Sequence, residues 1–367
     1  MDLLEISKMK NAYEDFMSLY TQKPVDIVLY GAGAGADWAL SLLEVHDIQP
    51  RHIIDKSHVC GGGVKRNIPI ISYDDLVRIY ENQEVYILIT SPRYEEEIYE
   101  HLREHFYVEQ IFSFECELYY HYIHDISAYR KYIFDRADEF MRLYQKLEDD
   151  FSRRTLENVL KGRMSAQLKY FREVYVQNQY FSQDIVSLGN HEIFVDIGAY
   201  IGDTVEEIVK ITGNNYEKIY CFEPDKKCAV ILKKNTQQYK NIEVVEKGAW
   251  DKHEFLCISE DSEHGASSIK QTGEYEIELD CIDDCINENE HITHIKMDIE
   301  GAELAALHGA RNTIQTYRPK LAICVYHKNE DILDISNYIL SIVPDYKLFL
   351  RHHNISGTET VLYAICD

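Results

Sequence analysis

Glycine and acidic residues recur directly after short apolar runs in the second half of this 367-residue chain. Asp196 lies in one such run and is followed by Gly198, Gly202 and Asp203. The glycines let the backbone turn tightly and approach a ligand, while neighbouring carboxylates favour a cationic ligand over a phosphate. This pattern predicts a site for a positively charged small molecule.

Polar residues also end the next apolar runs. Glu223 and Pro224 follow the second run, where an acid can accept hydrogen bonds from both hydroxyls of a ribose. The carboxyl ends of parallel strands meet at one edge of an open α/β sheet, so all these residues should share one rim. The remaining rim residues are Gly248, Ala249 and Trp250 after the third run, Lys296, Asp298 and Glu300 at the fourth, and His327 after the fifth.

Alternating apolar runs and amphipathic segments, from about Glu192 to the end of the chain, predict a doubly wound α/β domain that positions this rim. We expect the last two strands to form an antiparallel hairpin, and Glu254–Asp280 to form an inserted hairpin. The expected strands are Ile193–Ile197, Lys218–Phe222, Ile242–Glu246, Ile292–Met297, Leu321–Tyr326, Tyr346–Leu350 and Val361–Cys366. The expected helices are Thr204–Thr212, Lys226–Asn235, Ala302–Thr316 and Ile332–Ile342.

A second glycine loop, GAGAGA with Gly31, Gly33 and Gly35, follows the run VDIVLY near the start of the chain. It opens a helical segment, and Asp55 lies about 20 residues further on, as in a dinucleotide-binding fingerprint. The alternation here predicts a small Rossmann-like α/β domain with a nucleotide-sugar site. A scaffold for dimerisation or substrate delivery is an equally open interpretation.

The segment between these regions has helical spacing and almost no glycine, which predicts a helical connector. The predicted domains are therefore 1–116 (Rossmann-like), 117–190 (connector) and 191–367 (the catalytic α/β domain).

The chain carries 38 Lys and Arg against 63 Asp and Glu, a formal charge of −25. Such acidity disfavours nucleic acid and favours neutral, cationic or small substrates. Apolar runs are strand-sized, so we expect no membrane span, no signal peptide and a cytoplasmic location. The nine cysteines show no zinc-type pairing, and assembly into a homo-oligomer stays open.

Several segments together resemble the FkbM family of S-adenosylmethionine-dependent methyltransferases. The similarity covers Phe151 to Cys366, and the block IKMDIEGAE is its most distinctive part. The resemblance implies a class I methyltransferase fold, with a mostly parallel seven-stranded sheet and an antiparallel last strand. The other matching segments are QNQYF, FVDIGAYIGDT, CFEP, EKGAW, ASSI, LHGARNTI, RPKLAICVYH and LRHH…ETVLYAI.

The resemblance also implies a function, O-methylation of a sugar, glycan or natural-product hydroxyl with S-adenosyl-L-methionine as the cofactor. Tyr180 would cover the cofactor, and Asp298 would lie beside the transferred methyl. The implied cofactor-binding residues are Asp196, Gly198, Ala199, Gly202, Asp203, Thr204, Glu223, Pro224, Gly248, Ala249, Trp250, Tyr180 and Asp298.

A hydroxyl is a poor nucleophile, so a general base should assist its methylation. The candidates are His327 and Asp298, with Lys296 orienting a substrate oxygen; we expect no metal. Two other interpretations stay open, an NAD(P)-dependent oxidoreductase and a non-catalytic module that keeps the fold. Further candidates for acceptor contacts are His352, His353, Ser267 and Ser268.

Overall fold

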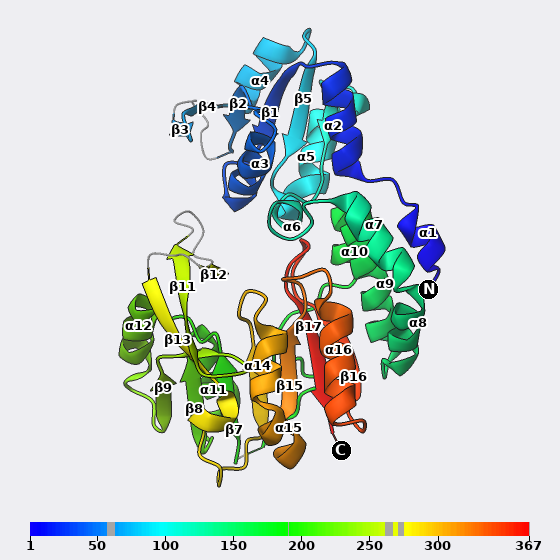
Figure 1. Cartoon of the computed structure of the whole chain (residues 1–367). Coiled ribbons are helices and arrows are strands. Elements are labelled where there is room, and N and C mark those ends of the chain that lie inside the picture. Colours follow the sequence, from blue (N-terminus) through cyan, green and yellow to red (C-terminus); the bar gives the residue numbers. More distant parts are fainter. Residues whose placement is uncertain (57–62, 190, 261–266, 271–274, 367) are drawn as a thin grey trace. The chain divides into compact units, whose positions relative to one another are not determined.

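The computed structural model describes residues 1–56, 63–189, 191–260, 267–270 and 275–366, which form two compact units (Figure 1). The connector predicted for 117–190 is helical from Glu117 to Arg172, and its residues are divided between the units. The separate roles proposed above for the three ranges stay predictions. Unit 1 comprises Met1–Met141, Arg154–Tyr175 and Asn354–Thr358, and unit 2 comprises Arg142–Arg153, Val176–His353 and Glu359–Asp367.

Unit 1 is built on a mostly parallel sheet with strand order β3-β4-β2-β1-β5-β6. Only β3 runs antiparallel among the described strands of this sheet. The Rossmann-like α/β fold predicted for this region is therefore confirmed, and its central strands β1 and β5 are apolar runs buried on both faces. The strands are β1 (Asp26–Tyr30), β2 (His52–Ile54), β3 (Val64–Lys65), β4 (Ile68–Ile71), β5 (Val85–Ile89) and β6 (Ile111–Phe112).

Helices before Tyr175 include several that the sequence analysis did not predict, such as α4, which begins after the N-cap Ser72. The α-helices are α1 (Leu3–Ser7), α2 (Ala12–Gln22), α3 (Ala34–Glu44), α4 (Tyr73–Tyr80), α5 (Glu95–Leu102), α6 (Glu117–His121), α7 (Ile126–Asp135), α8 (Ala137–Lys146), α9 (Asp150–Ser165) and α10 (Leu168–Arg172). Two 3₁₀ turns are η1 (Pro92–Tyr94) and η2 (Val108–Gln110).

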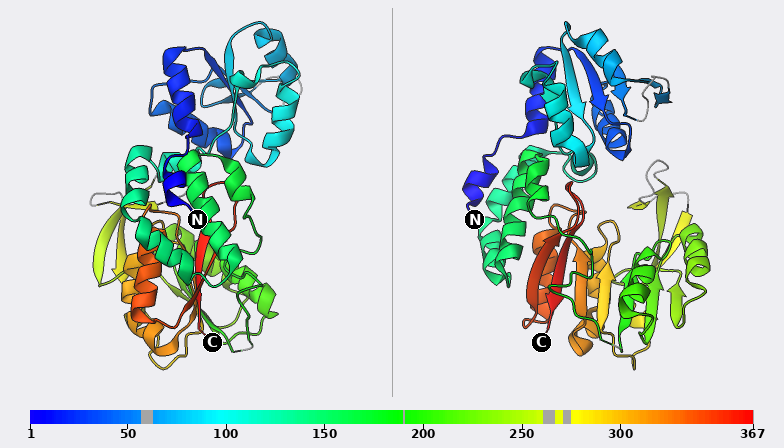
Figure 2. Two further views of the ribbon diagram at one scale, coloured as in Figure 1. Left: turned by 90° about the vertical axis from the view of Figure 1, so that its right-hand side faces the viewer. Right: turned by 180° about the vertical axis from the view of Figure 1, so that it is seen from behind.

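Unit 2 is built on a sheet with strand order β16-β17-β15-β14-β7-β8-β9, and helices cover both of its faces (Figure 2). β17 pairs antiparallel with β15 and β16, and the other described pairs in this sheet are parallel. This is the predicted class I methyltransferase topology. The strands are β7 (Ile193–Ile197), β8 (Lys218–Phe222), β9 (Ile242–Val245), β14 (His294–Met297), β15 (Lys320–Cys324), β16 (Lys347–His352) and β17 (Thr360–Ile365).

One helix prediction in unit 2 was wrong, because Ala302–Thr316 forms two helices that meet at Ala310. A Cβ added at Gly309 would lie 1.9 Å from the backbone oxygen of Trp250, so the chain packs there too closely for a side chain. This tertiary contact overrides the helical spacing. The helices are α11 (Asp203–Thr212), α12 (Lys226–Thr236), α13 (Ile282–Cys285), α14 (Glu303–Gly309), α15 (Arg311–Tyr317) and α16 (Asp331–Ile342).

The predicted insertion between the third and fourth main strands is a small separate sheet, with order β10-β13-β11-β12. β11 pairs antiparallel with β12 and with β13, as expected for a hairpin insertion. Ile277 and Leu279 of β13 are buried. The strands are β10 (Gly248–Ala249), β11 (Glu254–Glu260), β12 (Ser267–Lys270) and β13 (Tyr275–Asp280).

Among the described residues, every helix is too short or too polar to cross a lipid bilayer.

Candidate active site

A cavity of about 550 Å³ opens in unit 2, where β7, β8 and β14 end. Most of the residues predicted for the rim line it. They are Tyr180, Gly198, Asp203, Thr204, Glu223, Pro224, Gly248, Ala249, Lys296, Asp298 and Glu300.

Other predicted residues lie outside the lining of this cavity. Ala199 is fully buried. His352 forms a hydrogen bond with Thr360. His353 forms hydrogen bonds with the Val176 carbonyl and the Tyr363 hydroxyl. The side chains of Ser267 and Ser268 fall outside the described part of the chain. The predicted residues outside the lining are Asp196, Ala199, Gly202, Trp250, His327, His352 and His353.

Asp196 forms a buried ion pair with Lys296, with 3.0 Å between Oδ1 and Nζ. Although burial lowers the pKa of Lys296, the carboxylates of Asp196 and Asp298 outweigh that effect and raise it. The carboxylate of Asp196 therefore balances the charge of Lys296. Lys296 Nζ also donates to the Gly198 carbonyl over 2.8 Å, so this lysine holds the glycine loop.

Gly198 packs directly against the segment that follows β14. Its φ is +79°, and a Cβ there would lie 2.0 Å from the backbone oxygen of Asp298. A side chain at this position would push the glycine loop away from Asp298. Glycine is therefore needed where the two rim segments meet.

Glu223 has a fixed orientation at the end of β8. Its Oε2 accepts a hydrogen bond from the Tyr200 amide and its Oε1 accepts one from the Asp225 amide, each over 2.9 Å. Burial raises the pKa of Glu223 to about 7, although these two bonds oppose the shift. Asp225 itself caps α12 by accepting from the Cys228 amide over 2.8 Å.

Asp298 follows β14 and accepts hydrogen bonds from two tyrosines. Tyr180 Oη donates to its Oδ2 over 2.7 Å, and Tyr326 Oη lies 3.4 Å from its Oδ1. Burial opposes ionisation, but Lys296, His327 and the bond from Tyr180 hold the pKa of Asp298 below its usual value. Asp298 is thus a fixed negative charge at the cavity.

His327 is buried against three carboxylates. Its Nδ1 lies 2.9 Å from Glu303, and its Nε2 lies 3.4 Å from Asp298 and 3.7 Å from Glu300. Burial alone would lower the pKa of His327, but the three acids outweigh it and raise it to about 10. An imidazolium at neutral pH cannot accept a proton, so this geometry does not support His327 as the general base.

Glu359 lines the cavity and was missed by the sequence analysis. The sequence pattern marks residues at the carboxyl ends of parallel strands, whereas Glu359 precedes β17. Because β17 is antiparallel, its first residue lies beside the end of β15, where the Val325 amide donates to the Thr360 carbonyl. Other lining residues that the sequence did not single out as site residues include Gln179, Tyr200, Cys228, Ile277 and Leu279.

Acidic side chains dominate the cavity. Of the acidic and basic side chains lining it in the described part of the chain, six carry carboxyl groups and one is the Lys296 ammonium. The surroundings therefore favour a cationic ligand and disfavour an anion. The six are Asp203, Glu223, Asp225, Asp298, Glu300 and Glu359.

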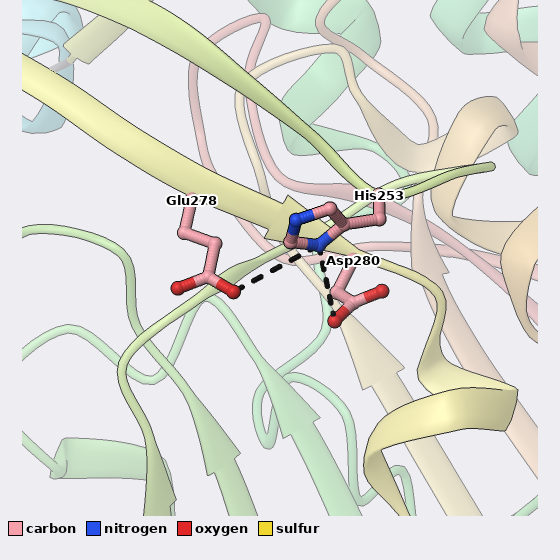
Figure 3. Close-up of side chains that lie close together, drawn as sticks. All are labelled: His253, Glu278 and Asp280. Carbon is pink, nitrogen blue, oxygen red and sulfur yellow. Dashed lines mark ion pairs between the residues drawn. The ribbon is translucent and has the colours of Figure 1, made fainter.

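A second group of titratable side chains lies on the inserted sheet, where His253 Nδ1 is 3.8 Å from Glu278 and 3.5 Å from Asp280 (Figure 3). Lys247 Nζ lies 2.8 Å and 2.7 Å from the same two carboxylates. Because Lys247 pairs with both carboxylates, we interpret the group as an ion-pair network that anchors β13.

The glycine loop of unit 1 is in close contact with neighbouring residues of unit 1. Asp55 accepts a hydrogen bond from the Ala32 amide over 3.2 Å, and a Cβ at Gly35 would lie 2.2 Å from the Thr90 carbonyl oxygen. The cavity beside Gly35 has about 120 Å³, less than a typical ligand pocket. The nucleotide-sugar site predicted from Gly31, Gly33, Gly35 and Asp55 stays a prediction.

Comparison with known proteins finds a family that matches most of the residues lining the cavity. Residues 196–349 match the family described as "Methyltransferase FkbM domain". A crystal structure of methyltransferase FkbM from Methylobacillus flagellatus KT matches with a TM-score of 0.81 and 26% identity, over 99% of this chain and 98% of that one. No curated protein matches the sequence.

Other solved structures show weaker similarity. Fibrillarin from Aeropyrum pernix, with natively bound S-adenosyl-L-methionine, has a TM-score of 0.33 and 10% identity over 50% of this chain and 71% of that one. An rRNA methylase from Streptococcus thermophilus has a TM-score of 0.32 and 13% identity over 48% of this chain and 88% of that one.

Proposed function

This chain carries a methyltransferase FkbM domain, and on that premise we propose that it transfers a methyl group from S-adenosyl-L-methionine to a hydroxyl of a sugar, glycan or natural product. The observation that carries the proposal is the excess of carboxylates in the cavity at the glycine loop. A donor with an ammonium and a sulfonium suits such a lining, whereas a nicotinamide dinucleotide would bring two phosphates into it.

The residues present fit this donor. Glu223 is oriented by two backbone amides and can accept hydrogen bonds from ribose hydroxyls. Gly248 and Ala249 lie in the lining with Ile277 and Leu279, which supply an apolar surface for an adenine ring. Asp203 and Asp298 offer carboxylates to the cationic part of the donor.

When bound, the donor supplies an electrophilic methyl group on a sulfonium. The protein aligns the acceptor oxygen with that carbon, and much of the acceleration in such a displacement comes from orientation. Tyr180 lies over Lys296, with 5.1 Å from Nζ to the ring centroid, and donates to Asp298. These contacts hold the side chains of Tyr180, Lys296 and Asp298 in place before the acceptor binds.

The charge of the cavity also limits the acceptor. A phosphate or carboxylate on the acceptor would meet six acids with only Lys296 as a counter-charge among the described lining residues. We therefore infer an uncharged acceptor that presents a hydroxyl.

Calorimetry with the purified full-length protein tests the donor. We expect S-adenosyl-L-methionine and S-adenosylhomocysteine to bind, and NADH fluorescence to show no binding. Binding of NADH in place of the methyl donor would instead favour the oxidoreductase interpretation.

Mass spectrometry of a panel of glycans and hydroxylated natural products tests the reaction. The expected result is a mass increase of one methyl group that depends on the donor. Donor binding without turnover on any compound would favour the non-catalytic interpretation.

A further inference from the structure

Glu359 directly precedes β17 and has an unusual backbone conformation. Its φ is +66°, in the left-handed region that non-glycine residues rarely adopt. Tyr180, Tyr200 and Glu300, which also line the cavity, share this region with φ of +66°, +46° and +54°. Backbone held in such conformations is common at functional sites, where the surrounding structure enforces it.

The carboxylate of Glu359 shares a tyrosine with Asp298. Tyr326 Oη lies 3.4 Å from Oε1 of Glu359 and 3.4 Å from Oδ1 of Asp298, and Gln179 Nε2 donates to Oε2 of Glu359. A phenol has one proton to donate, so it satisfies only one of the two acids at a time. The pair can therefore take up one further proton.

The two acids differ in their surroundings. Asp298 is held ionised by Lys296, His327 and Tyr180. Burial and the charge of Asp298 raise the pKa of Glu359 to about 7, although Gln179, His327 and Tyr326 oppose the shift. A pair of acids with separated pKa values is the usual arrangement for one fixed charge and one proton acceptor.

We propose that Glu359 is the general base of the methyl transfer, a role that rests on the function proposed above. As the acceptor oxygen bonds to the methyl carbon, the carbon–sulfur bond of the donor breaks and its electron pair stays on sulfur. The proton of the acceptor hydroxyl moves to the Glu359 carboxylate and later leaves to solvent. His327 keeps its proton throughout, and Asp298 remains charged.

Infrared titration of the full-length protein with S-adenosylhomocysteine tests the proton-accepting state directly. Comparison of the protein with Glu359→Gln should isolate one protonated carboxyl band that disappears with a midpoint near pH 7. Glu288→Gln, which removes an exposed acid, should leave that band in place. Identical titrations of the protein and Glu359→Gln would overturn the proposal.

Turnover gives a second readout, with any hydroxyl compound that the mass-spectrometric panel identifies. Glu359→Gln should lower kcat about 100-fold or more at pH 8, leave donor affinity within about threefold and abolish the rise of the rate through pH 7. If Glu359→Gln keeps both kcat and the increase of the rate through pH 7, the role of Glu359 as the general base is refuted, while the proposed methyl transfer is not. Failure of the unsubstituted protein to bind the donor would instead count against the proposed function.

Discussion

The ammonium of Lys296 lies 3.0 Å from the carboxylate of Asp196, and neither side chain is more than 5% exposed. The pair joins β14 to β7, neighbouring strands in the centre of the sheet. Lys296 also donates to the Gly198 carbonyl, so this buried pair holds the glycine loop in place.

Removing one partner of the Asp196–Lys296 ion pair should destabilise the fold. Lys296→Met leaves Asp196 buried without its counter-charge, and we expect the free energy of unfolding to fall by about 3–5 kcal/mol. Urea denaturation measures this loss. The double variant Asp196→Asn/Lys296→Met should recover part of it, and a single variant as stable as the parent would contradict the assignment.

Gly198→Ala should weaken both the fold and donor binding. The added methyl would lie 2.0 Å from the Asp298 carbonyl oxygen, at a φ of +79°. The matched control is Gly213→Ala, with φ +60° and no described atom within 4 Å, which should cost only about 1–2 kcal/mol of backbone strain. We expect a larger loss of thermal stability in Gly198→Ala and at least a tenfold loss of donor affinity in calorimetry. Equal behaviour of the two variants would argue against close packing at Gly198.

Affinity for S-adenosylhomocysteine should rise between pH 6 and pH 8. The Glu223 pKa is about 7, and only the ionised carboxylate can accept from two ribose hydroxyls at once. Glu223→Gln should bind roughly 10- to 100-fold more weakly at pH 8 and lose this pH dependence. Glu288→Gln serves as the control, because this exposed acid is not among the residues that line the cavity and its loss should keep the dependence. A flat profile in the parent protein would disprove the role of Glu223.

His327 should make stability depend on alkaline pH. Its pKa rises from about 6.5 in the unfolded chain to about 10 in the fold, so the contribution is complete below pH 6.5 and is lost as pH rises towards 10. Urea denaturation at pH 6, 8 and 10 should show a steeper decline for the parent than for His327→Gln. Parallel declines would mean that the imidazole is not held in its charged form.

The sequence predicted the central strands well because apolar runs buried on both faces carry a strong signal. The bounds of β7 and β8 agree with the prediction at both ends. The single helix predicted over Ala302–Thr316 was wrong because the contact between Gly309 and Trp250 is tertiary. No local pattern could reveal it.

The site was predictable where a residue follows a parallel strand, as Gly198, Glu223 and Asp298 do. Glu359 does not follow this pattern, because it precedes an antiparallel strand instead of following a parallel one. The roles of Asp196 and His327 depend on partners brought close by folding, Lys296 and Glu303 respectively. Charge balance between such distant residues cannot be read from spacing.

The surplus of acids in the cavity has a practical consequence for the choice of buffer. Polyamines and divalent cations are attracted by the same carboxylates as the methyl donor, so they compete with it wherever they reach the lining. Affinities measured in magnesium- or spermidine-containing solutions will therefore be apparent values, which depend on the concentration of these ions.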